Sequence, residues 1–571
     1  MAALMVGDGP GQHPTSSMTE PTDWEKRMNL TRRSFLILAG AGAAAGSLLR
    51  ALPSEAASAP GDVVGKITVG YQGWFACIGD GAPINGWWHW SQNWGQPPSP
   101  SNNAIKAWPD MAEYATGYQT AYGNLNGGGA ATLFSSFDQQ SVNTHLLWMQ
   151  QNGCDTAALQ RFNPNSSEGP TRDAMAAKVR SAAEANGRKF YIMYDVTGWT
   201  NMQPEIKTDW TSKMSAHTAS SAYAFQNGKP VVCIWGFGFS DSNHPWDAAT
   251  CLDVVNWFKS QGCYVIGGVP REWRTGTGGS RAGYLGVYHA FNMLSPWMVG
   301  AIGTATDSDS VYQNYNVPDQ ADCNANGIDY QPCVLPGDVS ANQRAHGDFM
   351  WRQFYNMVRV GAQGIYISMF DEYGEGNQIA KTAATQAGVP AGSGLLSLDQ
   401  DGTACSSDYY LRLTNDGGRM LKGQIALTAT RPTQPTLSSA TTVISLRSRA
   451  NNMYVTADNA GASPLIANRT AIGTWEQFDQ ITVGSGTIAL RAHANNMYVT
   501  ADNAGASPLI ANRTAIGTWE TFQLIQNPGG TVSLLALADN LYVTAENAGA
   551  SPLIANRTAI GTWEQFDLIT G

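Results

Sequence analysis

Three carboxylates stand within five residues of one another, at Asp371, Glu372 and Glu375. Carboxyl groups in unequal surroundings can act as a general acid and a general base, which is the minimal equipment for cleaving a glycosidic bond. A solvated acidic turn that follows a core strand is the alternative interpretation. Glu372 and Glu375 are candidate catalytic residues if the surrounding elements hold them in a cleft.

The acidic stretch follows a β-branched and aromatic run, 365–370, which is typical of a buried strand. A buried strand that delivers acidic side chains onto a flexible rim is how a (β/α)₈ barrel presents catalytic groups. Similar runs alternate with amphipathic helical stretches through residues 60–428, which indicates βαβ units and a parallel sheet. The strand-like runs are 67–71, 156–162, 190–195, 231–236, 264–268, 297–299, 330–335 and 365–370.

A (β/α)₈ TIM barrel is therefore the predicted fold of this region. The alternative is an open doubly wound sheet, but no glycine-rich phosphate fingerprint follows any of these runs. The carboxyl ends of barrel strands converge on one mouth, so the residues there are candidates for binding a substrate. They are Gln72, Trp74, Gln160, Arg161, Asp195, Trp235, Arg271, Glu272, Asp371 and Tyr373.

Each of these residues also has a plain structural explanation: Arg161 or Arg271 could pair with a carboxylate, and Trp235 could lie in the core. Together they predict a polar, aromatic-rimmed cleft that suits sugars better than cofactors. No cofactor and no metal are expected, because no cluster of metal ligands with the right spacing stands out. The stretch 322–327 copies the start of an EF-hand loop, but its twelfth position is Cys333 rather than Glu.

Three motifs resemble bacterial proteins grouped with glycoside hydrolase families 71 and 99, the second of which includes the endo-α-mannosidases. They are Val69–Phe75 (VGYQGWF), Leu159–Phe162 (LQRF) and Phe370–Ile379 (FDEYGEGNQI), and the resemblance covers residues 65–425. It implies that Glu372 deprotonates the sugar 2-hydroxyl to form a 1,2-anhydro intermediate. It also implies that Glu375 acts as general acid and then base at the glycosidic oxygen, with net retention.

The acidic loop departs from those mannosidases in three places. Asp371 replaces an amide, Tyr373 replaces a tryptophan, and Ala380 and Lys381 stand where an acidic residue is expected. A family-71-like α-glucanase therefore remains open, as does a conventional two-carboxylate mechanism that uses Asp195.

The composition favours a carbohydrate ligand over nucleic acid. Only 14% of the residues are charged and the net charge is −10, so no basic face is expected to neutralise phosphates. The chain holds 19 Trp and 21 Tyr, many of them in polar, glycine-rich stretches such as 87–94. Any one of these could be a core residue, but so many in loops favour stacking on sugar rings. The expected partner is a polysaccharide or oligosaccharide substrate, and the expected state is a monomer.

Residues 1–59 resemble a twin-arginine export signal. Arg32 and Arg33 precede an apolar run, 37–49, and a small-x-small cleavage pattern follows at 57–59. The run is shorter than the ~20 residues that span a bilayer, so no membrane span is expected. The mature protein is expected to be secreted, either to the periplasm or to the cell exterior. Eight cysteines do not make a disulfide scaffold, although Cys251–Cys263 and Cys323–Cys333 could pair.

A Pro/Thr-rich linker, 429–441, leads into three near-identical repeats in residues 442–571. Their tryptophans recur every 44 residues, at Trp475, Trp519 and Trp563. Three repeats of short strands and turns suit threefold closure better than an open solenoid, which predicts an all-β trefoil. The repeats resemble fascin-like trefoils and the trefoil carbohydrate-binding modules attached to secreted glycosidases.

Each repeat contains a Trp-Glu-x-Phe motif whose Trp and Phe would point to opposite faces of an extended segment. An exposed Trp can stack on a pyranose ring while the adjacent Glu accepts hydrogen bonds from its hydroxyls. The candidate glycan-binding residues are Trp475, Glu476, Trp519, Glu520, Trp563 and Glu564. The alternative is that the Trp residues only close the core.

Two hypotheses follow from the sequence. The first is a secreted, retaining hydrolase of an α-mannan- or α-glucan-like polysaccharide with a binding module attached. The second is a catalytically silent, lectin-like or fascin-like adhesion protein.

Overall fold

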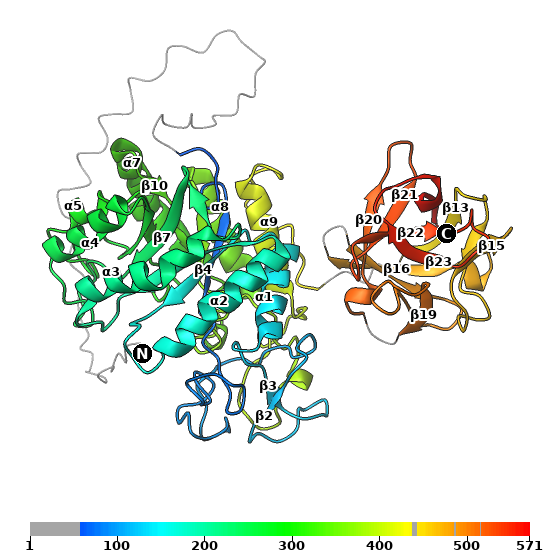
Figure 1. Cartoon of the computed structure of the whole chain (residues 1–571), viewed down its shortest axis with the longest axis horizontal. Helices are drawn as coiled ribbons and strands as arrows, with labels where there is room; N and C mark the ends of the chain where they lie inside the picture. The colour runs from blue at the N-terminus through cyan, green and yellow to red at the C-terminus, as the bar shows by residue number, and fades with distance from the viewer. Residues whose placement is uncertain (1–57, 437–441, 485–486, 514–515, 571) are drawn as a thin grey trace, which may run out of the picture. The chain divides into compact units, whose positions relative to one another are not determined.

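The structure, a computed structural model, describes residues 58–436, 442–484, 487–513 and 516–570. Residues 1–57 of the predicted export signal and residues 437–441 of the predicted linker lie outside the described residues. The described chain forms an α/β domain and a separate all-β C-terminal domain (Figure 1). Each domain is described by itself.

The α/β domain is built on one curled parallel sheet. Its strands are β1 (Ile67–Tyr71), β4 (Thr156–Arg161), β5 (Lys189–Asp195), β7 (Lys229–Trp235), β8 (Tyr264–Val269), β9 (Met293–Pro296), β10 (Asp329–Tyr330), β11 (Cys333–Val334) and β12 (Ile365–Ile367). Their order in the sheet is β10-β9-β8-β7-β5-β4-β1-β12-β11, and the pairs along this path are parallel.

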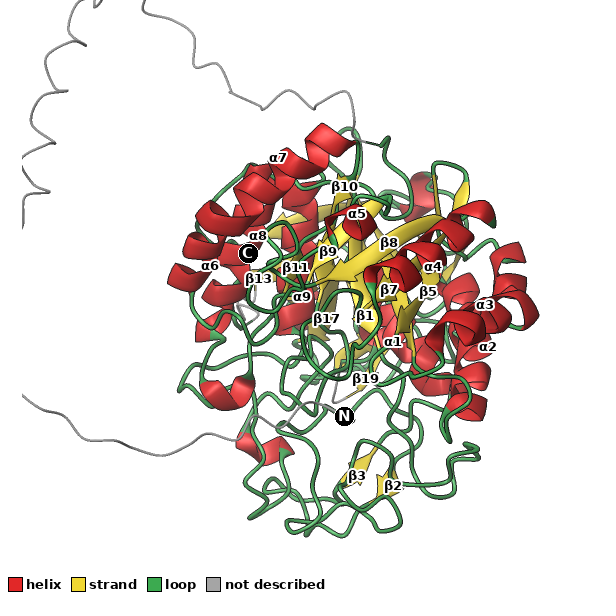
Figure 2. Ribbon diagram, turned by 90° about the vertical axis from the view of Figure 1, so that its left-hand side faces the viewer, coloured by secondary structure: helices red, strands yellow, loops and turns green. Residues whose placement is uncertain are grey.

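The two ends of this sheet are joined by a single short segment. β10 pairs with β9, β11 pairs with β12, and only Gln331 and Pro332 separate β10 from β11 along the chain. The sequence predicts one strand over 330–335, but a proline lacks the N–H that a continuous ladder requires. The segment 329–334 therefore pairs with β9 on one side and β12 on the other, and the domain is TIM-barrel-like (Figure 2).

Helices pack around the sheet (Figure 2). They are α1 (Gln139–Gln151), α2 (Gly169–Asn186), α3 (Met202–Ser212), α4 (Ala248–Ser260), α5 (Leu285–Tyr288), α6 (Ala305–Val311), α7 (Val317–Asn326), α8 (Asp348–Val360) and α9 (Tyr409–Leu421). The strands are buried on both faces, as their continuous apolar runs predict. In α8 the buried Met350, Phe354 and Met357 recur at helical spacing, and Gly361 ends the helix in a left-handed conformation.

One predicted strand is wrong, and the structure also bears on two other local patterns of the sequence. The predicted strand 297–299 is displaced, because β9 ends at Pro296. The EF-hand-like stretch lies in the last turns of α7, where a helix replaces the loop that calcium binding requires. All eight cysteines are buried and free, so the two suggested disulfides are not formed.

A loop-rich region accompanies the sheet at residues 72–138. It contains a small hairpin of β2 (Tyr118–Gln119) and β3 (Thr132–Leu133), visible at the lower edge of the α/β domain in Figure 1. Isolated bridges join this region to the segment after the acidic loop, at Ala107–Leu396, Pro109–Thr382 and Leu125–Pro390. The two long loops therefore form one layer.

The described helices include none that is long and apolar enough to cross a membrane.

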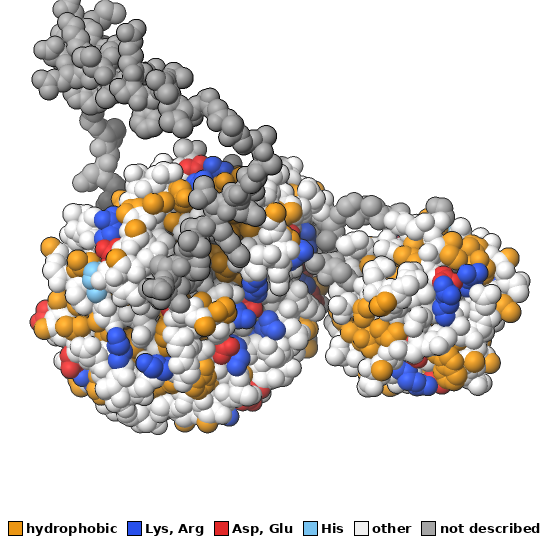
Figure 3. Space-filling view, turned by 90° about the horizontal axis from the view of Figure 1, so that it is seen from above, with side chains coloured by type: hydrophobic (Ala, Val, Ile, Leu, Met, Phe, Trp, Pro, Cys, Tyr) orange, Lys and Arg blue, Asp and Glu red, His pale blue; other side chains and the backbone are white. Residues whose placement is uncertain are grey.

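On the face shown in Figure 3, Lys and Arg side chains are dispersed among uncharged atoms.

The C-terminal domain consists of antiparallel strands. They are β13 (Thr442–Ser448), β14 (Tyr454–Thr456), β15 (Ile466–Arg469), β16 (Phe478–Gly484), β17 (Thr487–Ala492), β18 (Tyr498–Thr500), β19 (Ile510–Arg513), β20 (Phe522–Gln526), β21 (Val532–Ala536), β22 (Leu541–Ala545), β23 (Leu553–Arg557) and β24 (Phe566–Thr570). Six of them close a barrel in the order β13-β16-β17-β20-β21-β24. Each repeat adds one hairpin: β14–β15, β18–β19 or β22–β23.

A ring of backbone hydrogen bonds links the three hairpins. The N–H of Leu465 donates to the carbonyl of Leu509, Leu509 to Leu553, and Leu553 back to Leu465, each at 2.8 Å. The domain therefore has an internal threefold arrangement that follows the sequence repeat.

Candidate active site

Asp371 ties the acidic loop to the end of strand β1. Its side chain is fully buried, Oδ1 accepts the N–H of Gln72 at 2.9 Å and Oδ2 accepts the N–H of Gly73 at 2.8 Å. Burial raises the pKa of Asp371 to about 6, against the opposing effect of these two N–H groups. Because both oxygens are engaged by backbone donors, Asp371 positions the loop. This differs from the direct substrate contact that the sequence predicts.

Glu372 occupies a nearly water-free position beside Asp371. Only 6% of the residue is exposed; Oε2 accepts a hydrogen bond from Gln72 Nε2, and Oε1 accepts the N–H of Glu375 at 3.2 Å. Burial, followed by the negative charge of Glu375, raises the pKa of Glu372 to about 8. Burial and the neighbouring charge thus favour the protonated form of this carboxyl.

Glu375 lies on the same turn but is only half-buried. Burial raises the pKa of its carboxyl, and the ammonium of Lys106 acts in the opposite direction. Lys106 itself pairs with Asp338, with 2.6 Å between Nζ and Oδ2. The pKa of each of these two neighbouring, unequally buried carboxyls is raised, which favours a shared proton, the condition that separate acid and base roles require.

The far side of the loop is held by Arg344, which the sequence analysis missed. Its fully buried guanidinium donates from Nη2 to the carbonyls of Gly376 at 2.7 Å and Gln378 at 2.9 Å, and lies 4.4 Å from the ring centre of Tyr410. Gly376 has φ +73°, and a Cβ there would lie 2.9 Å from Val339. The loop path thus depends on a glycine and on a distant arginine that no local motif marks.

Five predicted binding residues carry a buried polar atom without a hydrogen-bond partner in the protein. These atoms are Oε1 of Gln72, Nε1 of Trp74, Oε1 of Gln160, Nη1 of Arg161 and Nε1 of Trp235. Their residues follow or end β1, β4 and β7 at the carboxyl edge of the sheet, which is the edge that carries the acidic loop. Buried polar atoms are nearly always paired, so this set offers donors and acceptors to a ligand.

Asp195 reaches the same edge at the end of β5, in register with Trp235. Its Oδ1 accepts the N–H of Thr197 at 3.0 Å and the hydroxyl of Thr197 at 2.6 Å. The Thr197 hydroxyl lies 3.1 Å from Nε2 of His244, whose Nδ1 lies 2.8 Å from Asp241 Oδ2. Burial raises the pKa of Asp195. Asp195 therefore remains a candidate at the mouth.

Arg161 and Arg271 are engaged elsewhere. Side chains alternate along a strand, so Arg161 points outward when Gln160 points inward. The buried Arg161 donates from Nε to Oδ2 of Asp209 at 2.6 Å, and Arg271 donates from Nε to Oε1 of Glu272 at 2.7 Å. Both arginines thus pair with a carboxylate, which the sequence analysis gives as the alternative to substrate binding.

Tyr373 is also directed into the protein. It is fully buried, its hydroxyl donates to the carbonyl of Lys381 at 2.9 Å, and its ring packs edge-on against Phe75 and Phe134. This aromatic cluster leaves the ring no free face for a ligand. The predicted substrate contact of Tyr373 is therefore replaced by a packing role, because the backbone turns between Glu372 and Glu375.

A second missed residue is Arg172, in the first turn of α2. Its guanidinium is buried, donates from Nη1 to the carbonyl of Gln72 at 2.7 Å, and lies 4.8 Å from the ring centre of Trp88 and 5.7 Å from that of Trp74. It supports the end of β1 and the tryptophans that follow. An arginine at a helix start is usually solvated, so the sequence offers no signal for this role.

Comparisons with solved structures include distant matches to both domains. No protein-family model matches the chain, and no curated protein matches it. The GH99 endo-α-mannosidase from Bacteroides thetaiotaomicron aligns at 14% identity with a TM-score of 0.45, over 63% of this chain and 98% of that one. The same enzyme in complex with bis-tris propane aligns at 15% identity with a TM-score of 0.45. The designed threefold protein ThreeFoil aligns at 21% identity with a TM-score of 0.21, over 22% of this chain and 97% of that one.

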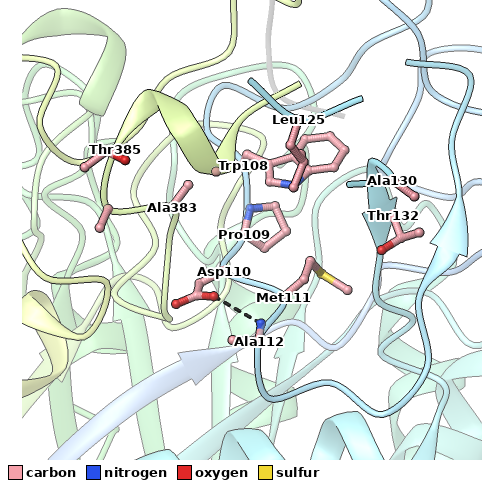
Figure 4. Close-up of a pocket in the computed structure, with 12 residues that line it drawn as sticks. Trp108, Pro109, Asp110, Met111, Ala112, Leu125, Ala130, Thr132, Ala383 and Thr385 are labelled. Carbon is pink, nitrogen blue, oxygen red and sulfur yellow. Dashed lines mark hydrogen bonds between the residues drawn. The ribbon is translucent and has the colours of Figure 1, made fainter. Parts of the chain in front are cut away.

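A separate cavity of about 440 Å³ lies in the loop layer (Figure 4). Trp108, Pro109 and Met111 line it, with Thr132 and Ala383. None of the acidic-loop carboxyls lines this cavity. Within the described ranges, no three His, Cys, Asp or Glu side chains are grouped as metal ligands would be.

The tryptophans of the three repeats lie at the surface of the C-terminal domain. Trp475, Trp519 and Trp563 are 37%, 38% and 36% exposed. Phe478, three residues after the first of them, is fully buried. The predicted difference in exposure between Trp and Phe is therefore confirmed, although the Trp lies in a 3₁₀ turn, Thr474–Glu476, and not in an extended segment.

The glutamates beside these tryptophans are not free acceptors. Glu476 is buried, and its Oε2 accepts the N–H of Gly473 at 2.8 Å, which closes the turn that carries the tryptophan. Glu520 and Glu564 make the same bond to Gly517 and Gly561. The predicted hydrogen bonds from these glutamates to a sugar are thus replaced by a capping role, because each side chain folds back onto its own turn.

Proposed function

We propose that the α/β domain is a glycoside hydrolase acting on an α-mannan- or α-glucan-like polysaccharide with retention of configuration. The observation that carries this proposal is the pair Glu372 and Glu375. These carboxyls are unequally buried, lie on one turn, and stand at the carboxyl edge of a curled parallel sheet, where catalytic groups of barrel enzymes are found.

The reaction needs one proton on the pair. It begins with Glu372 ionised and Glu375 protonated; a sugar 2-hydroxyl that donates to Glu372 favours this distribution, because a donor stabilises the charged carboxylate. Glu372 takes the 2-hydroxyl proton, O2 attacks C1, and Glu375 protonates the departing glycosidic oxygen. Water then attacks C1 while Glu375 accepts its proton and Glu372 returns a proton to O2. Two displacements at C1 give net retention.

Side chains around the pair hold it in place. Gln72 links Glu372 to the end of β1, and Asp371 fixes the same strand end through two backbone N–H groups. The raised pKa of Glu372 supports a shared proton on the pair. A conventional two-carboxylate mechanism would instead employ Asp195, whose burial also raises its pKa.

We further propose that the C-terminal domain is a β-trefoil that tethers the enzyme to the glycan. Its closed six-stranded barrel and three linked hairpins support the trefoil assignment. Three exposed tryptophans on one rigid domain would gain avidity on a polymer, even if each site is weak. Export by the twin-arginine route, supported by the motif at Arg32 and Arg33, would place the protein where such polymers occur.

A polysaccharide digestion screen tests the catalytic proposal. Native protein is incubated with α-mannans, α-glucans and β-glucans, and NMR records the anomer of the first product. We expect release from an α-linked polymer, with the anomeric configuration of the substrate retained. An inverted first product would contradict the retaining mechanism. The absence of release from every polymer would favour the adhesion protein.

A further inference from the structure

Trp94 stands on the surface of the α/β domain on a loop that is fixed by hydrogen bonds. Its side chain is 42% exposed, although its carbonyl accepts the N–H of Trp87 at 2.8 Å. The buried Asn102 clamps the same loop: its Oδ1 accepts the N–H of Asn93 at 2.8 Å, and its Nδ2 donates to the carbonyl of Gln96 at 3.2 Å. A large apolar ring is thus held exposed by an ordered backbone.

The loop places this ring at the end of a row of aromatic rings. His89 stacks on Trp74 with 3.7 Å between ring centres and a 15° interplanar angle, and Trp94 follows at 6.2 Å from His89. His89 has φ +60°, a left-handed conformation that is uncommon for a residue with a side chain. Such an outlier persists only where the surroundings enforce it, and these outliers gather at functional sites.

The inner end of the row is linked to the acidic loop through Gln72. Trp74 is two residues after Gln72, whose side-chain amide is bonded to Glu372. Arg172 lies against Trp74 and Trp88 and fixes this end from beneath. Burial and the charge of Arg172 lower the pKa of His89, so its ring stays neutral at ordinary pH. The row therefore extends from the segment after β1, whose Gln72 bonds to Glu372, to the exposed ring of Trp94.

We propose that Trp94, held by the stacked rings of His89 and Trp74, forms an outer sugar subsite and stacks on a pyranose ring of the same glycan chain that is cleaved at Glu372 and Glu375. The apolar C–H face of a pyranose matches a flat aromatic surface, and a preorganised ring loses little conformational freedom on binding. This inference rests on the proposed hydrolase function and makes it more specific. The substrate is a chain of several sugars, and a short oligosaccharide leaves the outer subsite unfilled.

The length dependence of hydrolysis tests this subsite. kcat/KM is measured on a disaccharide, a tetrasaccharide and an octasaccharide from the polymer that the digestion screen identifies. In native protein kcat/KM rises with chain length, and Trp94→Ala reduces the octasaccharide-to-disaccharide ratio about tenfold, as expected for the loss of one stacking contact. Trp94→Phe keeps most of the ratio, because it retains a ring.

Leu427→Ala is the matched control, since Leu427 is an equally open apolar side chain, 50% exposed, outside the aromatic row. It should keep the native ratio. An unchanged ratio in Trp94→Ala would overturn the subsite, as would an equal fall in the Leu427 variant.

Calorimetric titration separates this inference from the proposed function. Full-length Glu372→Gln protein, with and without Trp94→Ala, is titrated with octasaccharides of α-mannan and α-glucan. Weaker binding after the Trp94 change supports the subsite, even if the native protein hydrolyses nothing and the catalytic proposal fails. Equal binding by the two proteins, or none by either, contradicts the subsite.

Discussion

In the acidic loop, buried Glu372 accepts the N–H of Glu375, and in the first C-terminal repeat the equally buried Glu476 accepts the N–H of Gly473. The two differ because the charge of a second carboxyl, that of Glu375, also acts on Glu372 and raises its pKa. Both glutamates lie next to an aromatic residue, at Tyr373 and Trp475, and both looked similar in the sequence. The neighbouring aromatic residues differ in exposure, since Tyr373 is fully buried and Trp475 is exposed.

This contrast shows that burial of a carboxylate does not by itself indicate catalysis. At Glu476 a backbone donor satisfies the buried carboxylate and closes the turn. At Glu372 burial and the charge of a second carboxyl outweigh the hydrogen-bond donors, so the pKa rises and the protonated form is favoured. In the acidic loop the burial of Glu372 lowers stability and raises the pKa of a group that can transfer a proton. In the repeats the buried glutamates stabilise their own turns.

The largest expected effect is on catalysis. Glu372→Gln and Glu375→Gln should each reduce kcat by about 10²–10⁴-fold, because each removes one proton-transfer group. Initial rates of sugar release by the folded variants measure this loss. Glu184→Gln, on the exposed surface of α2, is a matched control that should behave as native. Full activity in either loop variant would remove that residue from the mechanism.

The next effect is on stability, and it should have opposite signs in the two regions. The pKa of Glu372 is raised from 4.5 to about 8. Between these values the folded chain keeps a proton that the unfolded chain releases, so the free energy of unfolding falls as pH rises. Glu372→Gln removes this penalty, and its α/β domain should melt above native at pH 8 and equal to native below pH 4.5.

Glu476→Ala should instead lower the melting temperature of the C-terminal domain, because it leaves the N–H of Gly473 without its acceptor. The expected cost is about 1 kcal/mol, as for other lost helix caps. Differential scanning calorimetry of the full chain at several pH values measures both domains. Destabilisation by Glu372→Gln at pH 8 would contradict the contrast between the two glutamates.

The smallest effect should come from the exposed tryptophans. Replacing Trp475, Trp519 and Trp563 by Ala, singly and in combination, should weaken retention on an insoluble glycan in steps of a few-fold each. Affinity electrophoresis or pull-down on the polymer measures the retention. Unchanged retention in the folded triple variant would show that these rings do not bind sugar.

Much of the fold could be predicted, because strand runs and repeats leave strong local patterns. The run 365–370 does lead into the acidic loop, although β12 itself ends at Ile367. The split between β10 and β11 was readable in principle from Pro332. The strand at 297–299 was misplaced because short apolar runs have no sharp boundary.

The site was less predictable, since its supports come from distant parts of the chain. Arg172 and Arg344 bond to backbone carbonyls of residues that are 32 or more positions away, and their local sequences resemble those of any solvated arginine. Arg161 and Tyr373 were misassigned because a strand end or a turn decides which way a side chain points. Outside a helix or strand, the spacing of residues in the sequence does not predict the direction of a side chain.

The pairing of β13 with β24 brings the first and last strands of the C-terminal domain together, with Ile444 opposite Thr570. The hydrogen bonds among Leu465, Leu509 and Leu553 also link the three repeats in a closed ring. The chain could therefore begin at any of the three repeats without a change in the strand pairing. The domain could be circularly permuted at any repeat boundary, or grafted into a surface loop of another protein. Its topology has no preferred starting point.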